Sequence, residues 1–159
     1  MKKIIDLKNL ASRSQELRTR GSKLVATNGC FDLLHVGHVR YLQSARALGD
    51  ALVVGVNGDS SVRQLKGKGR PINDERDRAE ILAALECVDY VVIFEEERAT
   101  KFLEAAAPAI YVKGGDYTID SLNLEERGAL QKLGAKIEII PLEQGYSTSK
   151  IVEQLRGSC

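Results

Sequence analysis

Both histidines of this chain, His35 and His38, lie in the segment 28–38 with Gly37 between them. The segment follows a predicted strand and opens a predicted helix, so side chains three residues apart project from neighbouring positions on one helix face. Imidazoles there can donate hydrogen bonds to phosphate oxygens, and the free N–H groups of a helix start favour an anion. Gly37 leaves room for the backbone to approach a polyphosphate. The segment therefore predicts a phosphate site.

Other interpretations of the same segment are weaker. A lone histidine would more often be a helix cap or a satisfied core residue, but a pair separated by glycine favours phosphate. Two histidines at i and i+3 with no third ligand nearby make a poor zinc site, so no protein side chain is assigned to a metal. Cys30 could be a nucleophile with the histidines as its base. A buried structural cysteine after a core strand is the better interpretation.

Three further segments carry residues suited to phosphates or a nucleotide. The loop 66–71 holds three cations and two glycines and can fold over a triphosphate, although a solvated surface loop fits its composition equally well. Residues 113–116 follow a predicted strand, where glycines permit close approach to a base or ribose and Asp116 can accept a hydrogen bond. Ser147 and Thr148 open the last predicted helix, where they can bind a β- or γ-phosphate, act as simple N-caps, or do both.

Residues after the second predicted strand are candidates for contacting the other substrate. Asn57 and Asp59 can hold hydroxyl groups or cap the next short helix. Arg76 and Arg78 stand among acidic residues and fit a solvated helix face with i,i+4 ion pairs. Only Arg76 is kept as a possible phosphate ligand.

Short β-rich runs alternate with helical patterns, which indicates a parallel sheet in a doubly wound α/β fold. In such folds ligands bind beyond the carboxyl ends of the strands, at the topological switch point. We expect an N-terminal helical segment (1–22), one nucleotide-binding domain (23–155) and a short tail (156–159). Asn73, Asp74 and Ser147 are the predicted helix caps. The predicted strands lie near residues 23–27, 51–57, 88–94, 109–113 and 136–141, and the helices at 6–20, 38–48, 74–85, 98–106, 124–133 and 148–155.

Composition limits the possible functions. The 159 residues suffice for one domain with a continuous core and leave no room for a second catalytic domain. A net charge of +1, from 23 basic and 22 acidic residues, provides no global field for nucleic acid or an anionic membrane. No apolar run resembles a signal peptide or the ~20 residues of a membrane span, so a cytoplasmic location is expected. The three cysteines lack C-x-x-C spacing and are interpreted as reduced thiols.

The pattern H-x-G-H, preceded by G-C-F-D-L-L, resembles the signature of the cytidylyltransferase-like nucleotidyltransferase superfamily, which has a Rossmann-like fold. Four further stretches are similar to one branch of it, the heptose 1-phosphate adenylyltransferases, which occur alone or as the second domain of bifunctional heptose kinase/adenylyltransferases. The resemblance covers residues 23–155. The four stretches are Val56-Asn57-Gly58-Asp59, residues 65–72, Val112-Lys113-Gly114-Gly115-Asp116-Tyr117 and Gly145-Tyr146-Ser147-Thr148-Ser149.

This resemblance implies adenylyl transfer from ATP to a sugar 1-phosphate, expected to be D-glycero-β-D-manno-heptose 1-phosphate, for surface-glycan precursors. It also implies Mg²⁺ held by phosphates, a separate sugar kinase and a homodimer. Catalytic roles fall on His35, His38, Lys66, Ser147 and Thr148. Nucleotide contacts fall on Gly29, Cys30, Phe31, Gly37, Lys113, Gly115 and Asp116, and acceptor contacts on Asp32, Asn57, Asp59, Arg70 and Arg76.

Two alternatives remain at this stage. A cytidylyltransferase acting on glycerol 3-phosphate or an amino-alcohol phosphate typically has R-T-E-G-I-S-T before its last helix. This chain has Leu142 where that arginine would be, which argues against that branch and makes Lys113 our candidate for the missing cation. A nucleotide-binding regulatory module without turnover is the alternative from another class. It would not need every phosphate-handling position, and here those positions are intact.

Overall fold

The protein folds around one parallel sheet, with strand order β3-β2-β1-β4-β5. The computed structural model describes residues 2–115, 118–141 and 145–157. All four strand pairings are parallel, which confirms the predicted doubly wound α/β architecture. The strands are β1 (Leu24–Gly29), β2 (Ala51–Asn57), β3 (Tyr90–Phe94), β4 (Ile110–Gly114) and β5 (Lys136–Ile140).

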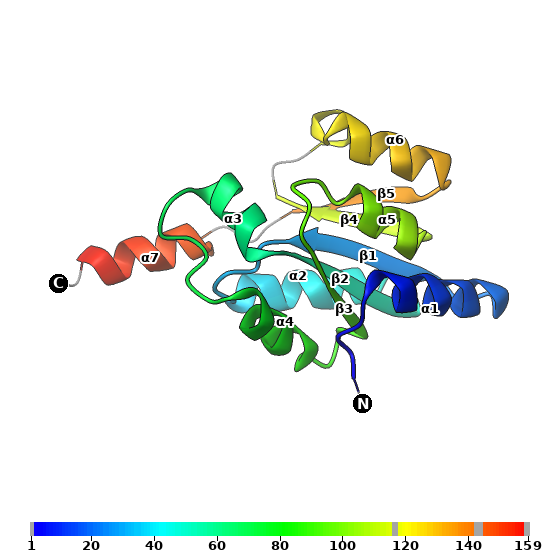
Figure 1. Cartoon of the computed structure of the whole chain (residues 1–159), viewed down its shortest axis with the longest axis horizontal. Helices are drawn as coiled ribbons and strands as arrows, with labels where there is room; N and C mark the ends of the chain where they lie inside the picture. Colours follow the sequence, from blue (N-terminus) through cyan, green and yellow to red (C-terminus); the bar gives the residue numbers. More distant parts are fainter. Residues whose placement is uncertain (1, 116–117, 142–144, 158–159) are drawn as a thin grey trace.

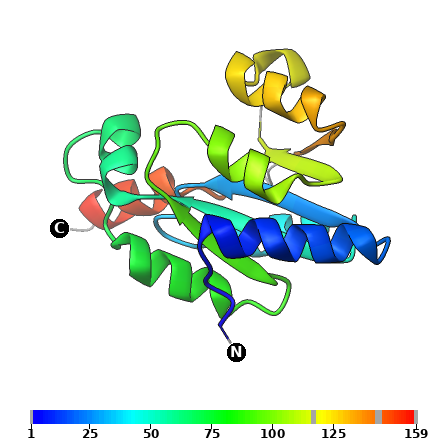
Figure 2. The same ribbon diagram turned by 45° about the vertical axis from the view of Figure 1, so that its right-hand side comes forward.

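Helices cover both faces of the sheet (Figures 1 and 2). The helices α1, α5 and α6 pack on one face, and α2 and α4 pack on the other. Helix α7 follows β5 and has no buried residue among those described. The bounds are α1 (Leu7–Thr19), α2 (Val36–Arg46), α3 (Asp59–Lys66), α4 (Glu75–Ala83), α5 (Thr100–Ala106), α6 (Leu124–Lys132) and α7 (Thr148–Gly157), with a 3₁₀ turn at Ile119–Ser121.

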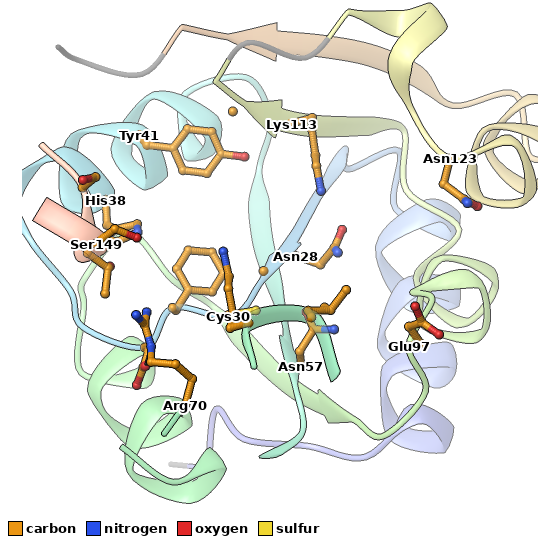
Figure 3. Close-up of a pocket in the computed structure, with 18 of the residues that line it drawn as sticks. Asn28, Cys30, His38, Tyr41, Asn57, Arg70, Glu97, Lys113, Asn123 and Ser149 are labelled. Atoms are coloured by element: carbon orange, nitrogen blue, oxygen red, sulfur yellow. Dashed lines mark hydrogen bonds and ion pairs between the residues drawn. The ribbon is translucent and has the colours of Figure 1, made fainter. Parts of the chain in front are cut away.

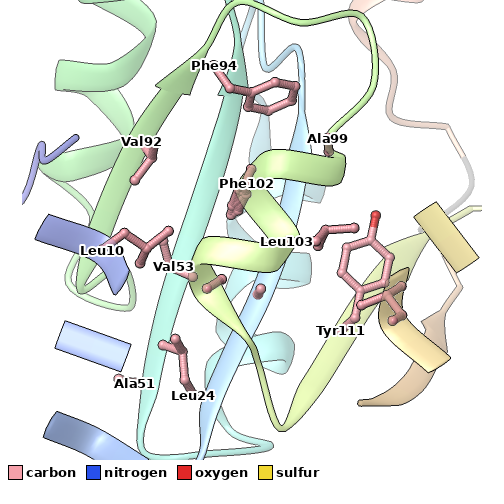
Figure 4. Close-up of a cluster of buried hydrophobic side chains, with 13 residues drawn as sticks. Leu10, Leu24, Ala51, Val53, Val92, Phe94, Ala99, Phe102, Leu103 and Tyr111 are labelled. Atoms are coloured by element: carbon pink, nitrogen blue, oxygen red, sulfur yellow. The ribbon is translucent and has the colours of Figure 1, made fainter. Parts of the chain in front are cut away.

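Each face of the sheet has its own hydrophobic core. Every residue of β2 is buried, as expected for a strand covered on both sides. Figure 4 shows the core beneath α1, α5 and α6, where Phe102 of α5 lies over β2. A Cβ on Gly55 would stand 2.8 Å from the Phe102 ring, so the missing side chain lets α5 approach the strand.

The N-terminal segment shares this core. Leu10 of α1 is fully buried, and the side chain of Ser14 donates a hydrogen bond to the carbonyl of Ala106. Upstream, the N–H of Ile5 donates to Val91 O at 2.9 Å. The boundary predicted at residue 23 therefore separates segments that pack together. A weak apolar face in the sequence concealed this because few positions of α1 make the contact.

Two elements begin at residues other than those predicted, because polar side chains determine where each one starts. Helix α2 begins at Val36, two residues before the predicted start, because His35 takes the N-cap position. Strand β3 begins at Tyr90 rather than Val88, after the Asp89 carboxylate has accepted hydrogen bonds from Leu52 N and Arg46 Nε. Within the described residues, none of the helices combines the length and the apolar character that a membrane crossing needs.

The switch point of the sheet lies between β1 and β4, which are neighbours. The chain runs outward from β1 through β2 to β3 on one side, and from β4 to β5 on the other. Ligands of doubly wound folds bind in the crevice at the carboxyl ends of the two central strands. This crevice receives the segment after β1, which carries both histidines, and Lys113 near the end of β4.

Candidate active site

A cavity of about 740 Å³ opens at these strand ends (Figure 3). Its volume lies within the range typical of small-molecule sites, roughly 300–1,000 Å³. Most of the predicted site residues line it, which brings together segments from the whole length of the chain. They are Gly29, Cys30, Phe31, Asp32, His35, His38, Asn57, Lys66, Arg70, Lys113, Ser147 and Thr148.

The two imidazoles form a close pair at the start of α2. Their ring centroids are 3.9 Å apart, and Phe31 lies 5.6 Å from the His38 ring. The backbone N–H of His35 donates to His38 Nδ1 at 3.3 Å. Because Nδ1 accepts this bond, the proton of a neutral His38 is on Nε2, which makes Nε2 the donor available to a ligand.

Burial keeps this pair neutral. Desolvation, with the nearby His35 as a smaller cause, lowers the pKa of His38 to about 4. Desolvation also lowers the pKa of His35. Near pH 7 the site therefore presents neutral imidazole donors rather than cations, and positive charge must come from neighbouring lysines and arginines.

Stability should fall in acid because of His38. An unfolded imidazole titrates near 6.5 and the folded one near 4, so between these values the unfolded chain binds more protons. The free energy of unfolding should be highest above pH 6.5, should decrease as the pH falls, and should reach its lower level below about pH 4. Urea midpoints across this window test the prediction. His38→Gln should flatten the profile, leaving the smaller contribution of His35, and an unchanged profile would contradict it.

Gly37 lies beneath the histidine pair rather than on the cavity wall. A Cβ at this position would stand 2.9 Å from the His35 ring and 3.0 Å from the Cβ of Tyr146. The missing side chain thus lets His35 fold back over the helix start. Tyr146 stacks on it, with ring centroids 6.2 Å apart and planes 20° apart.

Asp32 organises the loop that carries the cations. Its carboxylate accepts hydrogen bonds from Arg70 Nε and Ile72 N, both at 2.8 Å, and from Asn73 N at 3.0 Å. Burial opposes ionisation of Asp32, but the two amides and Arg70 outweigh it and hold its pKa below the usual range. These oxygens are occupied by the protein, so the structure favours loop anchoring over the predicted acceptor contact.

Arg78 corrects our interpretation of α4 as having a solvated arginine face. It is 1% exposed. Its guanidinium donates to the carbonyls of Asn73, Cys30 and Asn57 at 2.7–2.9 Å, and to Asp59 at 2.7 Å. It therefore joins the loops after β1 and β2 to the start of α4. The acidic neighbours that suggested i,i+4 pairs concealed this long-range role.

Besides the histidines, two further groups inside the cavity have pKa values changed by burial. Burial lowers the pKa of Lys113, and the nearby Glu126 carboxylate partly offsets this. Burial raises the pKa of the Cys30 thiol, which agrees with a structural cysteine and not with an activated nucleophile. Glu126 in turn accepts a hydrogen bond from Ala99 N at 2.9 Å, so α6 is tied to the loop before α5.

The start of α7 contacts the loop that leads into α2. The Thr148 hydroxyl donates to Leu33 O at 2.9 Å, and Ser147 Oγ accepts from Lys150 N at 3.0 Å. Ser147 thus has the predicted N-cap contact. Asp74 also caps its helix as expected, whereas Asn73 donates its side-chain amide to Asp32 O.

Some predicted residues are not brought to the cavity wall. Gly37, Gly115, Asp59 and Arg76 are absent from its lining, and Asp116 and Leu142 lie outside the described residues. In turn, several lining residues were assigned no site role from the sequence, and they come from loops, strand ends and helices at the same sheet edge. Their polar character after β3 and before α6 was the available signal. They include Asn28, Tyr41, Glu97, Arg98, Asn123, Glu126, Tyr146 and Ser149.

A family model described as cytidylyltransferase-like matches residues 26–154 of this chain. The chain belongs to this family. The match begins within β1 and ends within α7, so it includes every loop that lines the cavity. This membership confirms the predicted superfamily and, with it, the enzyme class, a nucleotidyltransferase.

Curated relatives are similar over nearly the whole chain. The bifunctional protein HldE of Citrifermentans bemidjiense is 52% identical over 156 residues, which is 98% of this chain and 32% of that protein. The bifunctional protein HldE of Helicobacter pylori is 48% identical over 157 residues, 99% of this chain and 32% of that protein. The chain spans about a third of the length of the relatives it matches.

Solved structures agree with the fold. The lipopolysaccharide core biosynthesis protein from Thermoplasma volcanium is 32% identical, with a TM-score of 0.64 over 80% of this chain and all of that one. Pantoate-beta-alanine ligase from Francisella tularensis is 15% identical, with a TM-score of 0.61 over 98% of this chain and 77% of that one. The second likeness shows a shared fold alone.

Proposed function

We propose that this nucleotidyltransferase transfers the adenylyl group of ATP to a sugar 1-phosphate, D-glycero-β-D-manno-heptose 1-phosphate, and releases ADP-heptose and pyrophosphate. The observation that carries the reaction class is the neutral His35–His38 pair opening into a cavity that also holds Lys66, Lys113 and Arg70. Similarity to the HldE proteins and to a lipopolysaccharide core biosynthesis protein supports a heptose as the acceptor.

The reaction needs no protein base. An oxygen of the acceptor phosphate attacks the α-phosphorus of ATP, and the bond from that phosphorus to the β-phosphate bridging oxygen breaks. The attacking monoester is already anionic at neutral pH, because its second pKa is about 6. Catalysis consists of positioning two anions that repel each other and stabilising charge on the transferring and leaving oxygens.

The side chains around the cavity suit these tasks. The two imidazoles donate hydrogen bonds without adding charge, and the N-terminus of α2 adds a partial positive charge. Lys66 and Arg70 flank the loop that we propose folds over the triphosphate. The backbone N–H groups at Ser147 and Thr148 can bind the leaving phosphates. The hydroxyl of Thr148 already donates to a carbonyl and is not counted as a donor.

Mg²⁺ is the proposed cofactor, carried by the triphosphate. Within the described part of the chain, no cluster of three or more His, Cys, Asp or Glu side chains could hold a metal ion. Asp32, the nearest carboxylate to the histidines in sequence, is occupied by Arg70 and two amides. These residues fit an ion held by phosphate oxygens and water. When bound, such an ion would supply positive charge that offsets the charge of the leaving pyrophosphate.

The sugar 1-phosphate that accepts the adenylyl group must be made by another reaction. An adenylyltransferase does not make the phosphate monoester it consumes, so we propose that a separate sugar kinase supplies it. The HldE relatives are named bifunctional proteins, which agrees with such a pairing. The cytoplasm as the location and a homodimer as the assembly remain proposals, the first from the apolar pattern of the sequence and the second from the family resemblance.

Pyrophosphate release tests the proposed function. Purified protein is assayed with ATP or CTP, each combined with heptose 1-phosphate or glycerol 3-phosphate. Only ATP with heptose 1-phosphate should give rapid release. A preference for CTP with glycerol 3-phosphate would identify the cytidylyltransferase alternative instead. Absence of release with every pair, despite measurable nucleotide binding, would favour a binding module.

A further inference from the structure

Polar side chains of three neighbouring strands, β1, β2 and β4, share one face of the sheet. Asn28 pairs in register with Gly55, and Asn57 lies two residues further along β2, so both point to the same side. That side also carries Tyr111, two residues before Lys113 in β4. It is the face covered by α5 and α6, opposite the face on which α2 packs with the histidine pair.

The cavity therefore has two chemically different parts. The part near α2 and α7 has imidazoles, free helix N–H groups and hydroxyls, which suit phosphates. The part beneath α5 and α6 has the amides of Asn28, Asn57 and Asn123 and the carboxylate of Glu97, together with two cations, Arg98 and Lys113 (Figure 3). A carboxylate repels phosphate, whereas amides and carboxylates suit hydroxyl groups, which both donate and accept hydrogen bonds.

The core fixes the orientation of the Asn28 amide. The Tyr111 hydroxyl donates to Asn28 Oδ1 at 2.5 Å, and the tyrosine is 1% exposed within the core under α5. With Oδ1 engaged in this way, the N–H₂ group of Asn28 is directed to the cavity as a donor. Within the described residues no hydrogen bond from this N–H₂ group is seen.

The side-chain amide of Asn57 has the opposite orientation to that of Asn28, with its N–H₂ group engaged by the protein. Its Nδ2 donates to Ser61 Oγ at 2.8 Å, and the residue is 4% exposed. Its Oδ1 is then the atom that can accept a hydrogen bond from a ligand. Neighbouring strands thus present one preset donor and one preset acceptor on the same face.

We infer that Asn28, oriented by Tyr111, together with Asn57, recognises hydroxyl groups of the sugar and determines specificity for a polyhydroxylated acceptor. This inference rests on the proposed function. Two adjacent hydroxyls can accept from Asn28 Nδ2 and donate to Asn57 Oδ1 together. Sites that hydrogen-bond a substrate hydroxyl discriminate strongly, because their buried polar groups are otherwise left unpaired.

Steady-state kinetics with both substrates varied test this role. Asn28→Asp keeps the bond from Tyr111 but replaces the donor with a carboxylate oxygen, and should raise KM for heptose 1-phosphate by about tenfold or more. Tyr111→Phe keeps the ring and removes the positioning hydroxyl, with an expected increase of about fivefold. Both should change KM for ATP less than about twofold, since neither residue faces the phosphate-binding part.

Tyr90→Phe is the matched control, because Tyr90 packs against the same core but does not line the cavity. It should leave both KM values unchanged. An increase in KM for ATP alone would place the nucleoside at Asn28 and overturn the inference. Unchanged KM values, or a loss confined to kcat, would also overturn it. A wild-type protein that turns over no sugar 1-phosphate would overturn the proposed function itself.

Discussion

Replacing His38 with alanine should lower kcat for pyrophosphate release by about 10²–10³ at saturating substrates, the usual cost of losing one donor to developing charge. The expected loss comes from the Nε2–H donor of His38. His35 N occupies Nδ1, and burial lowers the pKa to about 4, so the side chain works as a neutral donor. The fold should persist, because the residue lines an open cavity. Release is measured by a coupled phosphate assay, and folding by circular dichroism.

Two amide variants separate the roles of the ring nitrogens. Glutamine can place an N–H₂ group near the position of Nε2, whereas the shorter asparagine reaches only the position of Nδ1. His38→Gln should therefore retain about tenfold more activity than His38→Asn. Equal activity of the two variants would argue against an Nε2 donor. Near-normal release by His38→Ala would remove the histidine pair from the mechanism.

Replacing Arg78 with methionine should lower the free energy of unfolding by about 3 kcal/mol, because removing one partner from a buried polar network leaves the others unpaired. Four groups lose their donor: the carbonyls of Cys30, Asn57 and Asn73 and the carboxylate of Asp59. Asp59 is 31% exposed and can be rehydrated, so the buried carbonyls dominate the loss. Urea denaturation measures this change in the free energy of unfolding.

Arg76→Met provides the matched control two residues away. Arg76 is exposed and does not line the cavity, so its loss should change stability by less than about 0.5 kcal/mol and leave activity intact. The Arg78 variant should also lose activity at temperatures where it stays folded, because it no longer joins the loops that carry Cys30 and Asn57. Equal urea midpoints for the two variants would refute the structural role of Arg78. A large loss of activity in Arg76→Met would restore it as a substrate ligand.

Much of the fold could be predicted because its signals are local. Continuous apolar runs such as that of β2 mark strands covered on both faces, and Asp74 marked a helix start through its own side chain. The bounds of α2 and β3 were displaced because a histidine cap and an aspartate contact from another strand decide where those elements begin. The contribution of α1 to the core was missed because it depends on a few positions such as Leu10.

The sequence by itself determined the phosphate-handling segment, the parallel architecture and the enzyme family, since these rest on residue types at fixed local spacing. Only the tertiary structure decided that Arg78 is buried, that the Asn28 amide is oriented by Tyr111, and that Asn28 and Asn57 share a face. Each of these depends on contacts between residues far apart in the chain. The burial that keeps His38 neutral is likewise a property of the packed site, because desolvation sets its pKa.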